Sequence, residues 1–140
     1  MKAFTFGLEK VLNLRQFHED EAKIELGRAV GALAELESRI RSVAVERAKA
    51  AEDQFSPGNT AVEIQQYMYY LIRLDNTKER LLIEAAQAEL KVEEARSVYI
   101  EASRERKVLE KLKEKRYKEY RKSLFAEEAK ALDDVSRRRY

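Results

Sequence analysis

The chain has no cysteine, no tryptophan, a single proline and only four glycines among its 140 residues. The lack of cysteine excludes disulfide bonds and cysteine-ligated metal sites. The scarcity of proline and glycine leaves few places where a helix must stop, and 39% of the residues are charged. A composition that is rich in helix formers and poor in helix breakers is typical of long helices and coiled coils.

Long hydrophobic runs are also missing from the sequence. The longest purely apolar run extends from Tyr67 to Ile72, whereas a membrane-spanning helix needs about 20 such residues. The N-terminal stretch MKAFTFGLEK does not contain the apolar core of a signal peptide. We therefore expect a cytoplasmic protein that does not insert directly into a membrane.

One cluster of helix-breaking residues interrupts the chain. Pro57 and Gly58 stand side by side, which indicates a turn. Thr60 and Glu63 follow at the spacing of a capping box, which marks the start of a helix. The sequence therefore predicts helices over 5–53 and 61–136, joined by a turn at 54–60, within a single coiled-coil domain over 1–140.

Both predicted helices carry a seven-residue repeat of apolar positions. The rows of the first helix are Leu12, Glu19, Leu26, Leu33, Ile40, Arg47 and Leu8, Arg15, Ala22, Ala29, Leu36, Val43, Ala50. Those of the second are Tyr67, Leu74, Leu81, Ala88, Ala95, Ala102, Leu109 and Ile64, Leu71, Lys78, Ala85, Val92, Tyr99, Arg106. A narrow seam of this kind is buried best by another helix. Because the turn is short, the pattern predicts an all-α, long two-helix antiparallel coiled-coil hairpin with a longer second helix.

Charged residues, among them Glu19, Arg47, Lys78 and Arg106, stand in these seam rows. They reduce the apolar character of the seam, and two explanations are open: they fix the register, or they mark where the seam opens to a partner. The second helix is longer, so antiparallel pairing uses up the first helix near residue 110. We expect the last ~25 residues to project without a helical partner.

Known site motifs give little support for an enzyme. His18 begins a sequence similar to a zinc-protease motif, but Ala22 replaces the second histidine. Gly27 and Gly31 form a GxxxG pattern, which we interpret as close packing inside the hairpin. No phosphate loop, dinucleotide turn or nucleophile elbow is present. We expect a non-enzymatic protein without a cofactor or metal.

A row of basic side chains runs along the C-terminal part of the second helix. Spacings of three and four residues place its six members on one face: Arg104, Lys107, Lys111, Lys115, Lys118 and Lys122. The other side of this stretch carries Leu109, Leu112, Tyr117, Tyr120 and Leu124. The basic face favours docking onto an acidic protein surface. A solvated face, RNA or anionic lipid are the alternatives, and the few interleaved aromatics rank nucleic acid low.

A second candidate surface lies near the turn. Tyr69 falls opposite the seam, Tyr70 flanks it, and Val45 is outward-facing in the first helix. Outward aromatic and aliphatic residues are suited to anchoring a protein partner. Single exposed apolar residues are also common by chance, so both interpretations stay open.

Two stretches resemble the FliJ family of flagellar type III export proteins. They are the opening from Phe4 to Arg15, and the stretch from Arg106 to Arg116 with Tyr120 and Glu127-Glu128 after it. The resemblance implies an antiparallel coiled coil similar to the central stalk of rotary ATPases. It implies binding to the hexameric flagellar export ATPase, to the cytoplasmic domain of the export gate and to empty export chaperones. It also implies a peripheral location at the cytoplasmic face of the inner membrane.

The resemblance assigns the two candidate surfaces to different partners. The ATPase-binding candidates are Phe4, Phe6, Leu8, Arg15, Arg104, Lys107, Lys111, Lys115, Lys118 and Lys122. The export-gate-binding candidates are Val45, Tyr69, Tyr70 and Arg73. The alternatives are a chaperone-like coiled coil of another secretion system, and a coiled coil that uses its basic face to bind nucleic acid or a membrane surface.

Overall fold

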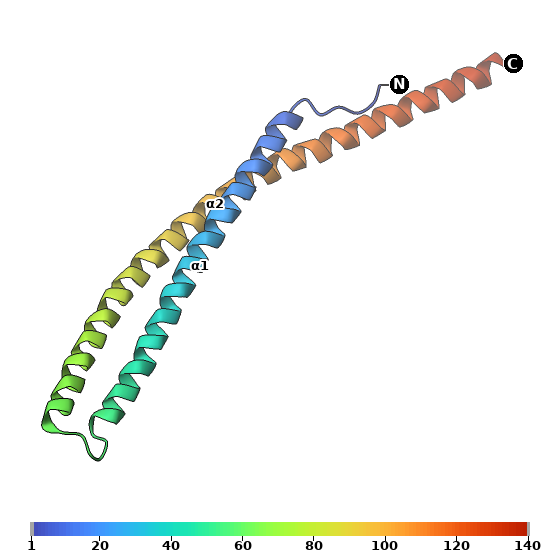
Figure 1. Ribbon diagram of the computed structural model, residues 1–140. Helices are drawn as coiled ribbons and strands as arrows, with labels where there is room; N and C mark the ends of the chain where they lie inside the picture. Colours follow the sequence, from blue (N-terminus) through green and yellow to red (C-terminus); the bar gives the residue numbers. More distant parts are fainter. Residues whose placement is uncertain (1, 140) are drawn as a thin grey trace. The chain divides into compact units, whose positions relative to one another are not determined.

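The computed structural model describes residues 2–139, which form two helices. Helix α1 covers Glu9–Gln54 and helix α2 covers Ala61–Arg138. The two helices are joined by a short connection and lie side by side next to it, as Figure 1 shows. The predicted all-α hairpin with a longer second helix is confirmed.

The chain contacts group into two compact units. The turn unit is Lys23–Val98, and the terminal unit combines Met1–Ala22 with Tyr99–Tyr140. In each unit a segment of α1 pairs with a segment of α2, through Arg47 and Asp75 in the turn unit and through Arg15 and Glu105 in the terminal unit. That the whole chain behaves as a single domain stays a prediction.

Helix α1 begins at Glu9, later than the expected residue 5. The backbone N–H of Glu9 donates to the carbonyl of Phe6 at 3.1 Å, so the chain turns at Gly7 and Leu8 before the helix begins. Phe6 is 7% exposed. Burial of the Phe6 ring stabilises the segment more than one further helical turn would. The further turn would add little, because the first N–H groups of a helix have no helical partners.

The connection between the helices satisfies the last carbonyls of α1. The side-chain amide of Asn59 donates to the carbonyl of Asp53 at 2.8 Å and to that of Gln54 at 3.1 Å. Gly58 has φ of 91°, a backbone conformation that glycine adopts at no steric cost. These contacts end α1 and reverse the chain within a few residues.

Helix α2 begins at Ala61, where the capping box predicts its start. The N–H of Glu63 donates to the hydroxyl of Thr60 at 3.2 Å, and the N–H of Thr60 donates to the carboxylate of Glu63 at 3.4 Å. Two of the N–H groups that a helix end leaves without partners are thereby satisfied. The helix ends at Arg138, close to the expected residue 136.

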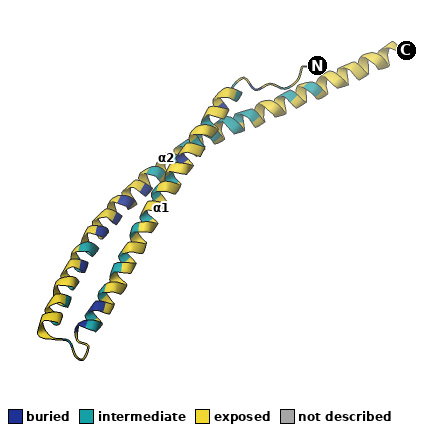
Figure 2. Ribbon diagram, in the orientation of Figure 1, coloured by how far each residue is buried: buried dark blue, intermediate teal, exposed yellow. Residues whose placement is uncertain are grey.

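The buried residues confirm the seven-residue seam. The buried hydrophobic residues are Ala50, Leu74, Leu81, Ala85, Ala88 and Val92 in the turn unit, and Phe6, Leu12 and Ala22 in the terminal unit. All except Phe6 stand in the predicted rows. Figure 2 shows the buried and half-buried positions as a line along each helix, with exposed residues elsewhere. The many alanines allow the two backbones to approach closely.

The interpretation of the GxxxG pattern as close packing within the hairpin is wrong. Gly27 and Gly31 are both exposed, and a Cβ atom built on either would have no atom of another segment within 4 Å. The physical reason is the register, because the seam passes through Leu26 and Ala29 and leaves both glycines outside it. Within the chain, these glycines only weaken α1.

Replacing Gly31 by alanine is therefore expected to stabilise the protein. Alanine is favoured over glycine in an exposed helix interior by about 0.8–1 kcal/mol, and the new methyl group meets open space. Urea unfolding should show a higher free energy of unfolding for Gly31→Ala. Gly58→Ala is the matched control, and it should lower stability because its φ is positive. Equal effects of the two changes would contradict this account.

Candidate functional site

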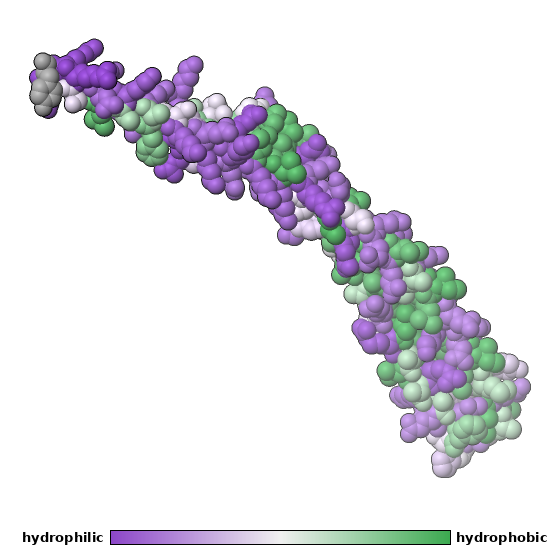
Figure 3. Space-filling model, turned by 180° about the vertical axis from the view of Figure 1, so that it is seen from behind, coloured by the Kyte–Doolittle hydropathy of each residue, from purple (hydrophilic) through white to green (hydrophobic). Residues whose placement is uncertain are grey.

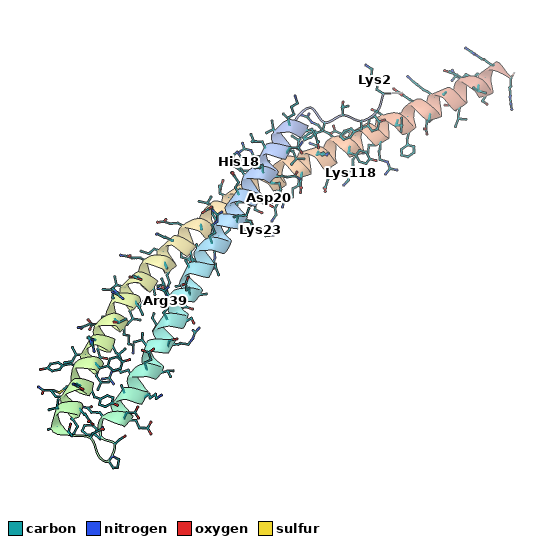
Figure 4. All side chains as sticks on the ribbon, in the orientation of Figure 1. Lys2, His18, Asp20, Lys23, Arg39 and Lys118 are labelled. Carbon is teal, nitrogen blue, oxygen red and sulfur yellow. The ribbon has the colours of Figure 1, made fainter. Side chains whose placement is uncertain are left out.

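The basic face predicted on α2 is present and open to solvent. Its six residues, defined here as the basic ridge, are Arg104, Lys107, Lys111, Lys115, Lys118 and Lys122, and all are exposed. Among the described residues, the ridge takes part in one ion pair, between Arg104 and Glu101 at 3.9 Å. Figure 4 labels Lys118 on this part of α2. The five lysines therefore keep their charges available for an external partner.

The stretch of α2 that carries the ridge also carries apolar and aromatic residues on its other side. Leu109, Leu112, Tyr120 and Leu124 are half-buried, whereas Tyr117 is 45% exposed. The structure thus confirms that this part of α2 has two different sides. The side with the tyrosines is partly covered by the N-terminal segment of the same chain.

That covering segment, residues 2–8, is a feature that the sequence analysis missed. The ring of Phe4 lies 5.2 Å from Tyr117 and 5.5 Å from Tyr120, measured between ring centroids. The hydroxyl of Tyr120 donates to the backbone carbonyl of Lys2 at 2.7 Å. The alternation of Phe4 and Phe6 before the helix was the available signal, because it places two aromatic rings next to an apolar stripe.

Helix α2 is consequently partnered further than expected. The sequence analysis placed the end of pairing near residue 110, but the N-terminal segment reaches Tyr120. An extended chain advances about 3.3 Å per residue, against 1.5 Å in a helix. Residues 2–8 therefore cover more of α2 than a helical continuation of α1 would. From Phe125 onward, every described residue of α2 is exposed.

The four N-terminal ATPase-binding candidates contact the chain itself. Phe6 is buried, and the guanidinium of Arg116 lies 5.8 Å from the centroid of its ring. Phe4 and Leu8 are half-buried. Arg15 pairs with Glu105 on α2. These residues lie in the same unit as the ridge, but they hold the unit together and offer little surface to a partner.

The charged seam residues of the terminal unit pair with each other. Arg106 bonds both Glu19 on α1 and Glu110 on α2, and Lys113 contacts Glu9 at 2.9 Å. The bond to Glu19, followed by that to Glu110, raises the pKa of the Arg106 guanidinium above its ordinary value. Cross-helix pairs form only when the helices are correctly aligned, so these charges favour a single register.

The turn unit repeats this arrangement with one pair. Arg47 donates to Asp75 at 2.6 Å, and this hydrogen bond holds the pKa of the Asp75 carboxyl below its ordinary value. Lys78, the other charged seam residue of the turn unit, is half-buried and adds to the positive field at Asp75. Register is therefore the explanation that the structure supports for the seam charges.

All four gate-binding candidates are exposed, but they do not form one cluster. Val45 is 69% exposed and Tyr69 is 57% exposed, and each lies on the side of its helix that is opposite the seam. Tyr70 bonds Glu46 at 3.4 Å, and the guanidinium of Arg73 lies 5.7 Å from its ring. The structure thus brings Tyr70 and Arg73 together on one flank and leaves Val45 on the other helix.

These surfaces offer exposed charges and exposed apolar side chains. Within residues 2–139, no group of three or more His, Asp or Glu side chains is arranged to hold a metal ion. Over the same residues, neither helix has a stretch that is apolar enough to cross a membrane. What the described residues present is a ridge of free positive charge and scattered exposed apolar side chains.

Breaking the Arg106 contacts should destabilise the chain measurably. Arg106→Gln removes a charge that two carboxylates contact while its side chain is 20% exposed, and we expect a loss of about 1–2 kcal/mol in the free energy of unfolding. Arg104→Gln is the matched control, with a side chain 73% exposed, and should change stability by less than about 0.5 kcal/mol. Urea unfolding would measure both, and equal losses would disprove the register role of the pair.

Comparison with known proteins gives one result. Residues 4–140 match the family model described as flagellar FliJ protein. The match extends over both units and includes the N-terminal segment, the basic ridge and the turn. Comparisons with curated proteins and with solved structures gave no match.

Proposed function

Because the chain belongs to the flagellar FliJ family, a component of flagellar protein export, we propose that it is a non-enzymatic stalk and adaptor of the export apparatus. In this role it binds the hexameric export ATPase through the terminal unit and the export gate through the turn unit. It also supports the delivery of substrates by export chaperones. The observation that carries the proposal is the basic ridge, whose five lysines have no ion-pair partner among the described residues.

The ridge suits an acidic protein surface on a ring. Its charges stand on one helical face at spacings of three and four residues, so they form a straight row. A row of free cations attracts acidic loops over a distance of about one Debye length, and salt weakens this attraction. A ring presents the same acidic loops several times, so one ridge meets more than one subunit. Binding several subunits together favours ring assembly by mass action.

The remainder of the terminal unit would support this contact. Phe4 packs on the two tyrosines, and Arg15, Glu19 and Arg106 form cross-helix ion pairs, so the side opposite the ridge is held in place. Phe6, Leu8 and Arg15 would then act by positioning the ridge. The exposed apolar residues Phe125, Leu132 and Val135 supply further contact surface toward the end of α2.

Reversing three ridge charges tests the ATPase contact. In Lys111→Glu/Lys115→Glu/Lys118→Glu the ridge loses its positive charge, and binding to the purified export ATPase should weaken at least tenfold, because three of the five free lysines become repulsive. Lys49→Glu/Arg80→Glu/Lys91→Glu is the matched control. It changes the net charge equally at exposed residues of the turn unit, and binding should stay within about twofold. Isothermal titration calorimetry would measure both variants, and circular dichroism would check that helicity is unchanged.

The same titrations distinguish this proposal from a general polyanion binder. If both triple variants lose affinity equally, the attraction depends on net charge and the ridge has no specific role. If the wild-type chain binds RNA or anionic vesicles as tightly as the ATPase, with a steep loss in salt, the nucleic-acid or membrane-surface alternative replaces the proposal. Unchanged binding of the ridge variant would remove the ridge from the account.

The gate contact is assigned to the exposed aromatic residues of the turn unit. Tyr69 is open to solvent, and Tyr70 with Arg73 forms a cation–π pair on the neighbouring flank. Tyrosine and arginine are enriched among residues that dominate binding energy. Val45 would contribute only if the gate domain contacts both helices. Contact with the gate would hold the protein at the cytoplasmic face of the inner membrane.

Truncating the two tyrosines tests this assignment. Tyr69→Ala/Tyr70→Ala should weaken binding to the purified cytoplasmic domain of the gate about tenfold, because it removes two aromatic anchors. Val62→Ala, at an equally exposed outward position, is the control and should leave binding unchanged. Thermal unfolding should stay close to wild type in both cases. A large fall in melting temperature for the tyrosine variant would show instead that these rings stabilise the fold.

A further inference from the structure

The two flanks of the seam in the turn unit differ sharply in character. One flank, defined here as the charged flank, carries Arg28, Glu35 and Arg39 on α1 and Arg80, Glu84 and Lys91 on α2. Two ion pairs within α1 lie on it, and the hydrogen bond between Tyr70 and Glu46 joins the two helices on this side. The charged side chains of this flank are well solvated in water.

The other flank carries apolar and small residues between its charged ones. Defined here as the apolar flank, it carries Val30, Ala48 and Ala51 on α1 and Met68, Ile72 and Leu82 on α2. Val30, Met68, Ile72 and Leu82 are between 45% and 50% exposed. Ala48 and Ala51 are three residues apart, and Met68 and Ile72 are four apart, so each pair lies on one side of its helix near the turn. Figure 3 shows apolar side chains gathered over the helices near the turn.

The size of this flank suits a stable interface. The turn unit contains about 30 residues of each helix, which is roughly 45 Å at 1.5 Å per residue. Two helices side by side are about 20 Å wide, so the flank offers roughly 900 Å². A standard protein interface buries about 800 Å² on each partner.

The charges on the apolar flank indicate which partner fits. The α1 half carries Arg41 and Lys23 with a single acid, Glu37, whereas the α2 half carries the acids Glu79 and Glu89 and an ion pair between Glu93 and Arg96. Asp75 also lies on this flank and is already paired with Arg47. The flank is therefore slightly basic along α1 and acidic along α2. A complementary partner must place acidic residues over α1 and basic residues over α2, and a second copy of the same flank does so.

We propose that two copies of the chain pack by their apolar flanks into an antiparallel four-helix bundle, with a two-fold axis parallel to the helices. This axis places α1 of each copy over α2 of the other, running in opposite directions. Basic and acidic halves then meet. The other two-fold arrangement places α1 over α1 and α2 over α2, so like charges meet.

The register within one chain sets the contacts between the two. Arg47 lies level with Asp75, so Arg41 lies level with a point on α2 between Glu79 and Leu82. With the two-fold axis parallel to the helices, Arg41 of one copy faces Glu79 of the other. By the same register, Ala48 and Ala51 face Ile72 and Met68, which pairs small residues with large ones. The seam of the dimer is thus complementary in both charge and volume.

The test uses the full chain and two variants with the same chemical change. Analytical ultracentrifugation at tens of micromolar protein should give twice the 16.4 kDa of one chain. Ile72→Glu, on the apolar flank, should weaken the dimer at least tenfold, because it buries an unpaired charge between the two copies, one helical turn from Asp75. Ile83→Glu is the control, since Ile83 is 62% exposed and lies on the outward row of α2, and the dimer should persist.

A charge exchange tests the arrangement itself. Arg41→Glu and Glu79→Arg should each weaken the dimer, and the double variant Arg41→Glu/Glu79→Arg should recover it, because only the predicted pairing restores opposite charges. The proposal is overturned if the chain is monomeric throughout the micromolar range. This holds even if another helical protein is found to bind the apolar flank. Equal dissociation by Ile72→Glu and Ile83→Glu, or no recovery in the double variant, overturns it as well.

Discussion

The structure depends on a single constraint, which is that two helices can shield only the narrow line where they touch. Every seam residue is therefore surrounded on one side only, and no side chain within residues 2–139 is completely enclosed. Alanines at Ala50, Ala85 and Ala88 compensate, because they allow the backbones to approach and exclude water from the larger residues between them. Everything outside this line remains available for recognition. A chain of 140 residues thus presents far more binding surface than a globular domain of equal length.

Charge in the seam is the second consequence of the narrow contact. An apolar line with a seven-residue repeat is nearly symmetric to a shift by one repeat, so apolar packing alone specifies alignment weakly. Glu19 with Arg106 and Arg47 with Asp75 remove this ambiguity, because a shifted alignment leaves each charge without its partner. The seam charges thus give up some apolar packing in exchange for a single alignment of the two helices.

The sequence was sufficient for the fold because the signals that define it are local. The repeat, the Pro57-Gly58 break and the capping box of Thr60 and Glu63 lie within short windows, and the structure confirms them. The N-terminal segment was missed because the alternation of Phe4 and Phe6 indicates an apolar contact but does not identify its partner, and Tyr120 is 118 residues from Lys2. The GxxxG pattern was misread because its meaning depends on which face the seam takes. The basic ridge was predicted from spacing, but its freedom from ion pairs required the structure.

The short connection at Gly58 sets the order in which the molecule is built. Contacts close to it, such as that between Gln54 and Ile64, close small loops at low entropic cost, whereas Lys2 and Tyr120 close a loop of nearly the whole chain. We therefore expect folding to start at the turn between the helices and to proceed toward the termini. During synthesis α1 then has no helical partner until the first turns of α2 leave the ribosome, and the N-terminal segment is expected to pack last.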